Sequence, residues 1–258
     1  LAGDLYSKGF LRLPIHLNKG INRFLVQAFR GGFKLRILPA EGTCSISPYD
    51  WLLPDLREDS LLRSYGAVVI LNHTGQLLED AVLEVGDSHV FERISIELDP
   101  IIPYGIAKPP FPLRQLRHPG PDDLKGEIFE LPVTLRHGRT VQTVYLPMPL
   151  RRTGQPYKGT KISDIDGSVQ YYAVRPPINF DPKSSYALYL TLHGAGVEAT
   201  GQVAAYTSKR DGFIVAPTNR RPYGFDWQEW GRLDALETLD PVSYTHLRAH
   251  ETMHDLVC

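Results

Sequence analysis

Hydrophobic and polar residues alternate along short stretches of the first 150 residues, with the period of two that a half-buried strand shows. In the clearest stretch, 93–98, Ile94 and Ile96 alternate with Ser95 and Glu97. Apolar or alternating stretches predict further strands at residues 9–13, 23–30, 33–38, 65–72, 81–85, 129–135 and 140–147, the last two joined by a tight turn at 137–139. Residues 100–121 contain seven prolines and almost no periodicity, so we expect a long surface loop there.

These strands predict two β-rich modules. Residues 1–60 are expected to form a partial jelly-roll-like module, because the chain turns at Gly20 and then enters a strand. Any other antiparallel sandwich fits that segment nearly as well. Residues 54–60 mix acidic and basic side chains and are expected to be a linker. Residues 61–155 are predicted to form an immunoglobulin-like β-sandwich, since short strands recur at the spacing typical of that fold.

The pattern changes at about residue 160. Strands are predicted at residues 168–175, 185–192 and 213–217, and helices at 197–209 and 230–239. The second and third of these strands are mostly apolar, which is typical of strands buried on both faces of a parallel sheet. Leu233, Leu236 and Leu239 form the apolar stripe of the last helix. Alternating strands and helices predict βαβ units, and the strand ending at Pro217 is expected to be an open, aggregation-prone edge.

Residues 241–258 resemble the translation of a library adaptor used in transposase-based DNA sequencing. One frame of that adaptor encodes Val-Ser-Tyr-Thr-His-Leu-Arg-Ala-His-Glu-Thr, a barcode follows, and the next codons encode Leu-Val-Cys. We therefore expect this tail to be an artefact and exclude it from the fold. The exclusion removes a false H-E-x-x-H zinc-protease pattern at His250-Glu251-Thr252-Met253-His254, so neither a metal nor a cofactor is expected. Leu1 is not an initiator Met, so either a leader was removed or the sequence begins inside the gene.

Without this tail the basic and acidic residues balance, since Arg248, Glu251 and Asp255 are removed. A near-neutral chain gives no electrostatic reason to expect nucleic acid or an anionic membrane as a partner. No apolar run approaches the roughly 20 residues of a membrane span. Only Cys44 remains, so no disulfide framework is possible and the compartment stays open.

Candidate chemistry begins at His193-Gly194-Ala195-Gly196, directly after the second apolar strand. Glycine suits a loop whose backbone N–H groups must meet an oxyanion without a side chain in between. Open α/β sheets also bind ligands at the carboxyl ends of their parallel strands. A glycine-rich turn from a strand to a helix, without a catalytic role, is the alternative.

Four segments in sequence order, at residues 166–174, 188–199, 214–227 and 231–237, resemble bacterial serine hydrolases of the α/β-hydrolase superfamily. The pattern is most similar to the prolyl-oligopeptidase-like and esterase-like members, in which β-rich modules often precede the catalytic domain. In that family the loop after the third strand carries an H-G-G-G-type oxyanion motif. The resemblance implies that residues 160–240 are the N-terminal part of an α/β-hydrolase domain. It also implies backbone oxyanion donors at Gly194, Ala195 and Gly196, with His193 orienting the loop.

The loop after the third apolar strand is a second candidate site. We expect Arg221, Tyr223, Asp226 and Trp227 to line a substrate pocket. Alternatively, Trp227 and Trp230 pack the loop and Asp226 caps the following helix, and this reading is favoured because such contacts are common at loop–helix joints.

These observations predict a fragment of a serine hydrolase that acts on an ester or peptide bond through an acyl-enzyme. No G-x-S-x-G elbow occurs in the chain, so the nucleophile, acid and base are expected beyond residue 240 and the fragment is expected to be inactive. Expected substrates are small-molecule esters, peptides or glycan-linked groups. The alternative is a β-sandwich protein that binds a carbohydrate or a protein and carries a degenerate hydrolase domain. By analogy with other multi-module proteins, a periplasmic or secreted location is favoured over the cytoplasm.

Overall fold

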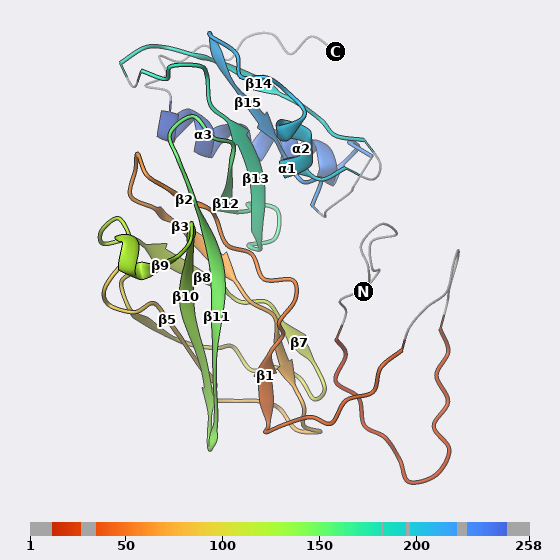
Figure 1. The fold of residues 1–258 in the computed structure, drawn as a ribbon. Coiled ribbons are helices and arrows are strands. Elements are labelled where there is room, and N and C mark those ends of the chain that lie inside the picture. Colours follow the sequence, from red (N-terminus) through yellow and green to blue (C-terminus); the bar gives the residue numbers. More distant parts are fainter. Residues whose placement is uncertain (1–11, 27–34, 182, 195–196, 221–225, 247–258) are drawn as a thin grey trace.

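The structure is a computed structural model that describes residues 12–26, 35–181, 183–194, 197–220 and 226–246 (Figure 1). After an extended N-terminal segment, the chain forms two β-rich bodies. We call residues 44–151 the N-terminal body and residues 157–246 the C-terminal body. In Figure 1 the first is drawn in orange to green and the second in teal to blue.

The N-terminal body contains three sheets. Its strands are β1 (Cys44–Ile46), β2 (Leu56–Arg57), β3 (Arg63–Ala67), β4 (Ile70–Asn72), β5 (Val82–Val85), β6 (Ile94–Glu97), β7 (Ile106–Ala107), β8 (Pro110–Arg114), β9 (Leu124–Lys125), β10 (Ile128–His137) and β11 (Thr140–Arg151), with one short 3₁₀ helix, η1 (Pro121–Asp123). The sheet orders are β1-β4-β7, β3-β8 and β2-β11-β10-β5-β6, with β9 also paired to β10. All pairs are antiparallel except β2 with β11.

The long hairpin of β10 and β11 is the central element of the largest sheet in this body. Its register runs from Ile128 opposite Pro149 to His137 opposite Thr140. Alternate residues of β10 are buried, as the period of two predicts, and Gly138 takes a left-handed φ of +55° in the turn between the strands. The strands predicted at 129–135 and 140–147 and the turn at 137–139 are therefore confirmed.

A single apolar core holds the N-terminal body together. Its largest fully buried side chains include Phe91, Phe111 and Met148. Cys44 and Ile46 of β1 pack into the same core. Residues 44–57, which lie in the first predicted module, thus contribute side chains to one core with residues 61–150.

The prediction of a surface loop over residues 100–121 is wrong, because β7 and β8 lie there. In β8 the exposed Pro110 and Pro112 alternate with the buried Phe111 and Leu113. Proline is tolerated on an edge strand, where its missing N–H costs no ladder bond. Since β8 pairs with β3 alone in a two-stranded sheet, the prolines concealed a strand that the side-chain alternation encodes.

The extended segment is not the strand-rich module that its pattern predicts. Residues 12–26 and 35–43 form no strand, so the strands expected at 23–30 and 33–38 are wrong in their described parts, while 9–13 lies mostly outside the described residues. The turn at Gly20 is present, with a φ of +100°. Ile21 and Leu25 are 87% and 103% exposed, because within the described part of the chain this segment pairs with no strand.

The C-terminal body is a four-stranded sheet with helices on both faces. Its elements are β12 (Tyr157–Ile162), β13 (Val169–Arg175), β14 (Ala187–Leu190), α1 (Ala199–Ala204), β15 (Gly212–Ala216), α2 (Trp230–Glu237) and α3 (Leu239–His246). The sheet order is β12-β13-β15-β14. Only β14 and β15 are parallel, with α1 between them in sequence, while β13 is antiparallel to both of its neighbours. The predicted parallel sheet is therefore mixed. None of the helices in the described residues is long and apolar enough to cross a membrane.

Alternate residues of the central strands face opposite sides of this sheet. Ala173 and Ile214 pack with α1, and Val174 and Val215 pack on the other face with Val242 of α3. All five residues of β15 are buried, which confirms the predicted strand with two covered faces. Residues 241–246 of the suspected tail lie within α3.

The prediction of a fully buried strand is wrong for β14, in which Ala187 and Tyr189 are exposed. The reason is its position: within the described part of the chain, β14 has a neighbour on one side only. The sheet therefore ends at β12 and at the open edge β14, and not at the strand ending at Pro217, because β15 lies between β13 and β14.

Helix α2 forms where predicted but buries a different face. Leu233, in the expected apolar stripe, is 38% exposed, whereas Gly231, Asp234 and Ala235 are buried. A Cβ at Gly231 would overlap Oδ1 of Asn219, so glycine permits the close approach of the preceding loop. The helix is therefore held by a polar contact face that hydrophobic spacing cannot reveal.

The carboxylate of Asp55 joins the two bodies. It accepts hydrogen bonds from Arg151 Nε at 2.8 Å and from the backbone N–H of Lys158 at 3.0 Å. Ser64 of β3 and Thr160 of β12 add a hydroxyl contact of 2.8 Å. These bonds fix the C-terminal sheet against the N-terminal body.

Candidate functional site

The glycine loop, residues 191–198, connects β14 to α1. In chain order β14 is the third strand of its sheet, and the loop leaves its carboxyl end beside that of the parallel β15. His193 and Gly194 are described, whereas Ala195 and Gly196 lie outside the described residues. The glycine motif therefore follows the carboxyl ends of the parallel strands, where α/β proteins bind ligands.

Three successive carbonyls of this loop accept bonds from the protein. Gln202 Nε2 approaches the carbonyl of Leu192 at 3.5 Å, and Trp227 Nε1 donates to that of His193 at 2.9 Å. The carbonyl of Gly194 accepts from the backbone N–H of Val197 at 3.4 Å. The loop is therefore held from α1 on one side and from the loop after β15 on the other.

His193 is a buried part of this loop. Its ring Nδ1 lies 3.3 Å from the carbonyl oxygen of Gly194, and only a protonated Nδ1 can donate to a carbonyl. In that tautomer Nε2 is the unprotonated nitrogen, and it is buried without a hydrogen-bond partner among the described residues. The side chain is 2% exposed and meets the Trp227 indole edge-on, with the ring centroids 5.0 Å apart. This geometry is compatible with the predicted orienting role.

Gly194 is exposed, and in the described structure no heavy atom lies within 4 Å of the position that a Cβ would occupy. A backbone N–H beside open space can donate to an incoming oxyanion. No serine–histidine contact is found at this edge among the described residues.

The loop after β15 contains the second group of predicted site residues. Arg221 and Tyr223 lie outside the described residues. Asp226 is exposed and Trp227 is half-buried. Asp226 Oδ1 accepts from the N–H of Gln228 at 3.2 Å, so it caps a turn before α2, whose own N-cap is Glu229. The expectation that Asp226 caps the helix is therefore wrong by three residues.

A polar cluster fastens this second loop, and sequence spacing did not reveal it. Arg220, at a left-handed φ of +62°, donates through Nη1 to Ser163 Oγ at 2.6 Å and through Nη2 to Asp166. Burial raises the pKa of Asp166, but hydrogen bonds from Arg220 and Ser168 outweigh it and hold the pKa below its usual value. The cluster ties the turn between β12 and β13 to the loop after β15.

Buried charges extend this cluster toward α2. Lys161 Nζ lies 2.8 Å from Glu237 Oε2 and 3.7 Å from Oδ1 of the fully buried Asp234. Burial raises the pKa of Glu237, but the bonds from Lys161 and Ser163 lower it overall. Asp234 Oδ1 has no hydrogen-bond partner among the described residues, so the Lys161 ammonium is its neutralising charge.

A serine–histidine pair lies elsewhere, in the N-terminal body. Ser45 Oγ and His73 Nε2 are 2.9 Å apart. His73 Nδ1 is buried and has no partner in the part of the chain that the structure describes, so no carboxylate orients the ring there. Ser45 is also the middle residue of a strand rather than an elbow. The pair lacks the orienting third group of a catalytic triad.

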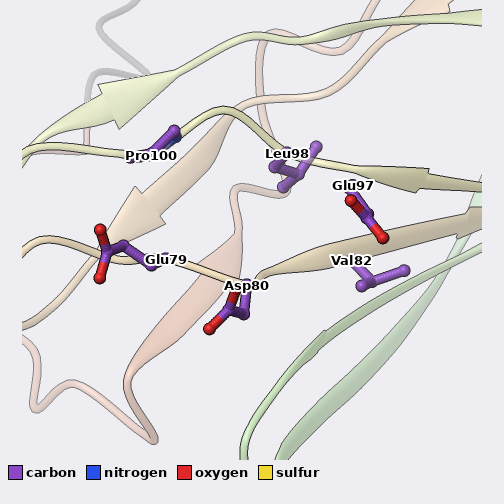
Figure 2. Close-up of a pocket in the computed structure, with 6 residues that line it drawn as sticks. All are labelled: Glu79, Asp80, Val82, Glu97, Leu98 and Pro100. Carbon is purple, nitrogen blue, oxygen red and sulfur yellow. The ribbon is translucent and has the colours of Figure 1, made fainter.

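A hollow of about 440 Å³ lies on the N-terminal body, lined by Glu79, Asp80 and Glu97 beside three less polar residues. Figure 2 shows these six side chains. The three carboxylates do not converge on one point. Among the described residues, no group of three His, Cys, Asp or Glu side chains is arranged to hold a metal ion. The H-E-x-x-H pattern at residues 250–254, which we reject as a false zinc-protease motif, lies outside those residues.

A larger hollow of about 820 Å³ lies at the junction of the two bodies. Arg63, Tyr65 and Tyr172 are among its lining residues, and the Arg57 guanidinium lies 4.5 Å above the ring of Tyr157. Burial raises the pKa of Tyr172 to about 12, so its hydroxyl stays protonated at neutral pH. The hollow combines cationic and aromatic groups.

No protein-family model matches the chain, and a search of curated proteins finds no match. Among solved structures, the chain is similar to one described as the crystal structure of a thermostable esterase, with a TM-score of 0.30 and 14% sequence identity. The aligned region covers 70% of this chain and 62% of that structure, so the chain spans less than two thirds of the esterase's length. The chain is a β-rich protein with several sheets and few helices, and these comparisons do not show a family for it.

Proposed function

We propose that the chain is a fragment of a serine hydrolase that cleaves an ester or peptide bond through an acyl-enzyme, and that this fragment is inactive. The observation that carries the proposal is the glycine loop: it follows the third strand of its sheet, its carbonyls are tied back, and Gly194 borders open space. This is where an α/β-hydrolase places an oxyanion donor.

In this proposal the glycine loop and the loop after β15 supply one half of the reaction site. The Gly194 N–H, with those of Ala195 and Gly196, donates to the oxygen that becomes negatively charged when a serine attacks the carbonyl. His193 orients the loop. Arg221, Tyr223, Asp226 and Trp227 line the substrate side, and the nucleophile, acid and base follow residue 240.

The division of the chain belongs to the same proposal. Residues 44–57 of the first predicted module, 1–60, share the core of the second, 61–155, and this β-rich unit precedes the hydrolase domain. Residues 160–240 begin that domain, and residues 241–258 are adaptor-derived. The buried residues of the cores lie on either side of residue 151, and the half-buried Leu52 packs across from the N-terminal body. This division supports a boundary between the second module and the hydrolase domain.

The second candidate function is a binding protein with a degenerate hydrolase domain. The junction hollow favours it, because Arg63 and Tyr65 offer a cation and a 41% exposed aromatic ring beside it. Such a combination suits a carbohydrate or a protein segment with an anionic group.

Long-read sequencing of the source DNA across the codon for Asp240 is the first test. A frame that continues into a strand and G-x-S-x-G supports the hydrolase. A frame that encodes residues 241–258 and then stops removes the adaptor explanation and favours the binding protein.

Activity of the purified chain is the second test. Residues 1–258 are expected not to turn over a generic aryl ester, because an oxyanion loop without a nucleophile cannot form an acyl-enzyme. Turnover that Gly194→Pro abolishes would contradict the proposed inactivity.

A further inference from the structure

We infer that Trp227 is a positioning residue, which fixes the direction of the Gly194 N–H, and that it is not chiefly a wall of the substrate pocket. This inference rests on the proposed function, because a fixed N–H matters there as an oxyanion donor. It assigns to the indole a role that neither pocket lining nor simple loop packing describes.

The argument begins with the peptide unit between His193 and Gly194. The carbonyl of the first residue and the N–H of the second belong to one planar group, and in a trans peptide they point in opposite directions. No cis peptide bond occurs among the described residues. Whatever holds the His193 carbonyl therefore also aims the Gly194 N–H.

Trp227 holds that carbonyl, since its Nε1 donates to the oxygen at 2.9 Å. The Gly194 N–H must then point away from the indole. Gly194 is also exposed, and no heavy atom of the described residues lies within 4 Å of the position that its Cβ would occupy, so a ligand can approach this peptide unit. Without the bond, a glycine peptide rotates at little steric cost, and the donor would lose its direction.

The indole is itself held in place. Its ring meets the His193 imidazole edge-on, which fixes its tilt. Asn219 Nδ2 donates to the carbonyl of the preceding Asp226 at 2.6 Å, and Arg220 anchors the start of the same loop to the turn between β12 and β13. A continuous series of contacts therefore runs from Asp166 to Gly194. The polar cluster of Arg220, Ser163 and Asp166 thus supports the Gly194 N–H indirectly, through the loop that carries Trp227.

The test is the orientation of the Gly194 N–H in ¹⁵N-labelled residues 1–258, measured as a residual dipolar coupling against the amides of β15. Trp227→Phe keeps an aromatic ring beside His193 but removes the donor. The matched control is Trp230→Phe, because Trp230 is 59% exposed and lies near Arg220 rather than on the glycine loop. Thermal unfolding of all three proteins separates a local change from loss of fold.

We expect the Gly194 coupling to fall at least about twofold in Trp227→Phe, through averaging over several orientations, while the β15 couplings and the Trp230→Phe protein stay unchanged. In the unsubstituted protein, the indole N–H of Trp227 should exchange at least about tenfold more slowly than that of Trp230. This second measurement applies even if Trp227→Phe does not fold.

An unchanged Gly194 coupling in folded Trp227→Phe, or equal exchange of the two indoles, overturns the inference. Neither readout needs catalysis. Failure of the proposed function would instead appear in the DNA that follows Asp240, so the two failures are distinguishable.

Discussion

The two bodies are stabilised by different means. The N-terminal body packs long antiparallel strands around one continuous apolar core. The C-terminal body divides its apolar contacts between two smaller clusters and adds the buried charges of Lys161 and Asp234. The candidate site lies only in the second body. Burial of apolar area serves stability without specifying direction, whereas hydrogen bonds and charges fix where a backbone donor points.

The largest expected effect is in the apolar core. Phe111→Ala should lower the free energy of unfolding of the N-terminal body by about 4 kcal/mol, because it removes a fully buried ring and leaves a cavity. Urea unfolding followed by circular dichroism measures the change. Ile102→Ala is the control, since Ile102 is 67% exposed and its loss should cost less than about 0.5 kcal/mol. Equal effects of the two substitutions would contradict a single dominant core.

The next effect is in the buried charges. Lys161→Met should cost about 3 kcal/mol, because Asp234 and Glu237 would lose the cation that neutralises them. Lys108→Met is the matched control: it breaks an ion pair with Asp50, whose side chain is 69% exposed, and should cost less than about 1 kcal/mol. If the two variants unfold at the same urea concentration, the cluster does not stabilise the C-terminal body.

A smaller effect is expected in acid. Hydrogen bonds hold the folded-state pKa values of Asp166 and Glu237 below their ordinary values of 3.8 and 4.5. Their contribution to stability is therefore complete above the ordinary values and is lost as the pH falls through the lowered ones. In Lys161→Met the pKa of Glu237 should return toward its ordinary value. The free energy of unfolding should then change less steeply with pH between about 5 and 3 than in the unsubstituted protein. An identical slope would show that Lys161 does not lower that pKa.

The smallest expected change in the free energy of unfolding belongs to a variant of β14 that should instead change how readily the protein aggregates. Ala187→Lys places a charge on the open edge β14 and should slow aggregation, because charged side chains oppose pairing between exposed edges. Its effect on the free energy of unfolding should stay within about 0.5 kcal/mol. Light scattering measures the aggregation, with Val141→Lys as the control at a 55% exposed strand position of the other body. Equal slowing by both variants would point to net charge rather than to the edge.

Sequence reasoning succeeded where the neighbours of a residue are set by the local pattern. The hairpin of β10 and β11 follows from alternation and a tight turn, and β15 follows from a short apolar run. It failed in residues 12–26, because alternation cannot show whether a partner strand exists. The same limit explains β14, whose exposure depends on the strand order.

The candidate site was predictable only in part. The glycines after β14 follow from a motif, but the bond from Trp227 to His193 joins residues 34 positions apart. Lys161 and Glu237, which form an ion pair, are 76 positions apart. The spacing of leucines in α2 predicted that the face with Leu233 is buried, but Leu233 is exposed. Such contacts depend on tertiary structure, which no local periodicity encodes.

The position of Asp55 has a consequence for synthesis. Every strand of the first core lies before Tyr157, so that core can fold while the later strands are still inside the ribosome. Asp55 is then already paired with Arg151, but the backbone of Lys158 arrives only afterwards. The carboxylate thus offers the emerging β12 a preformed acceptor, and the nascent chain would assemble its second sheet upon a template that is already rigid.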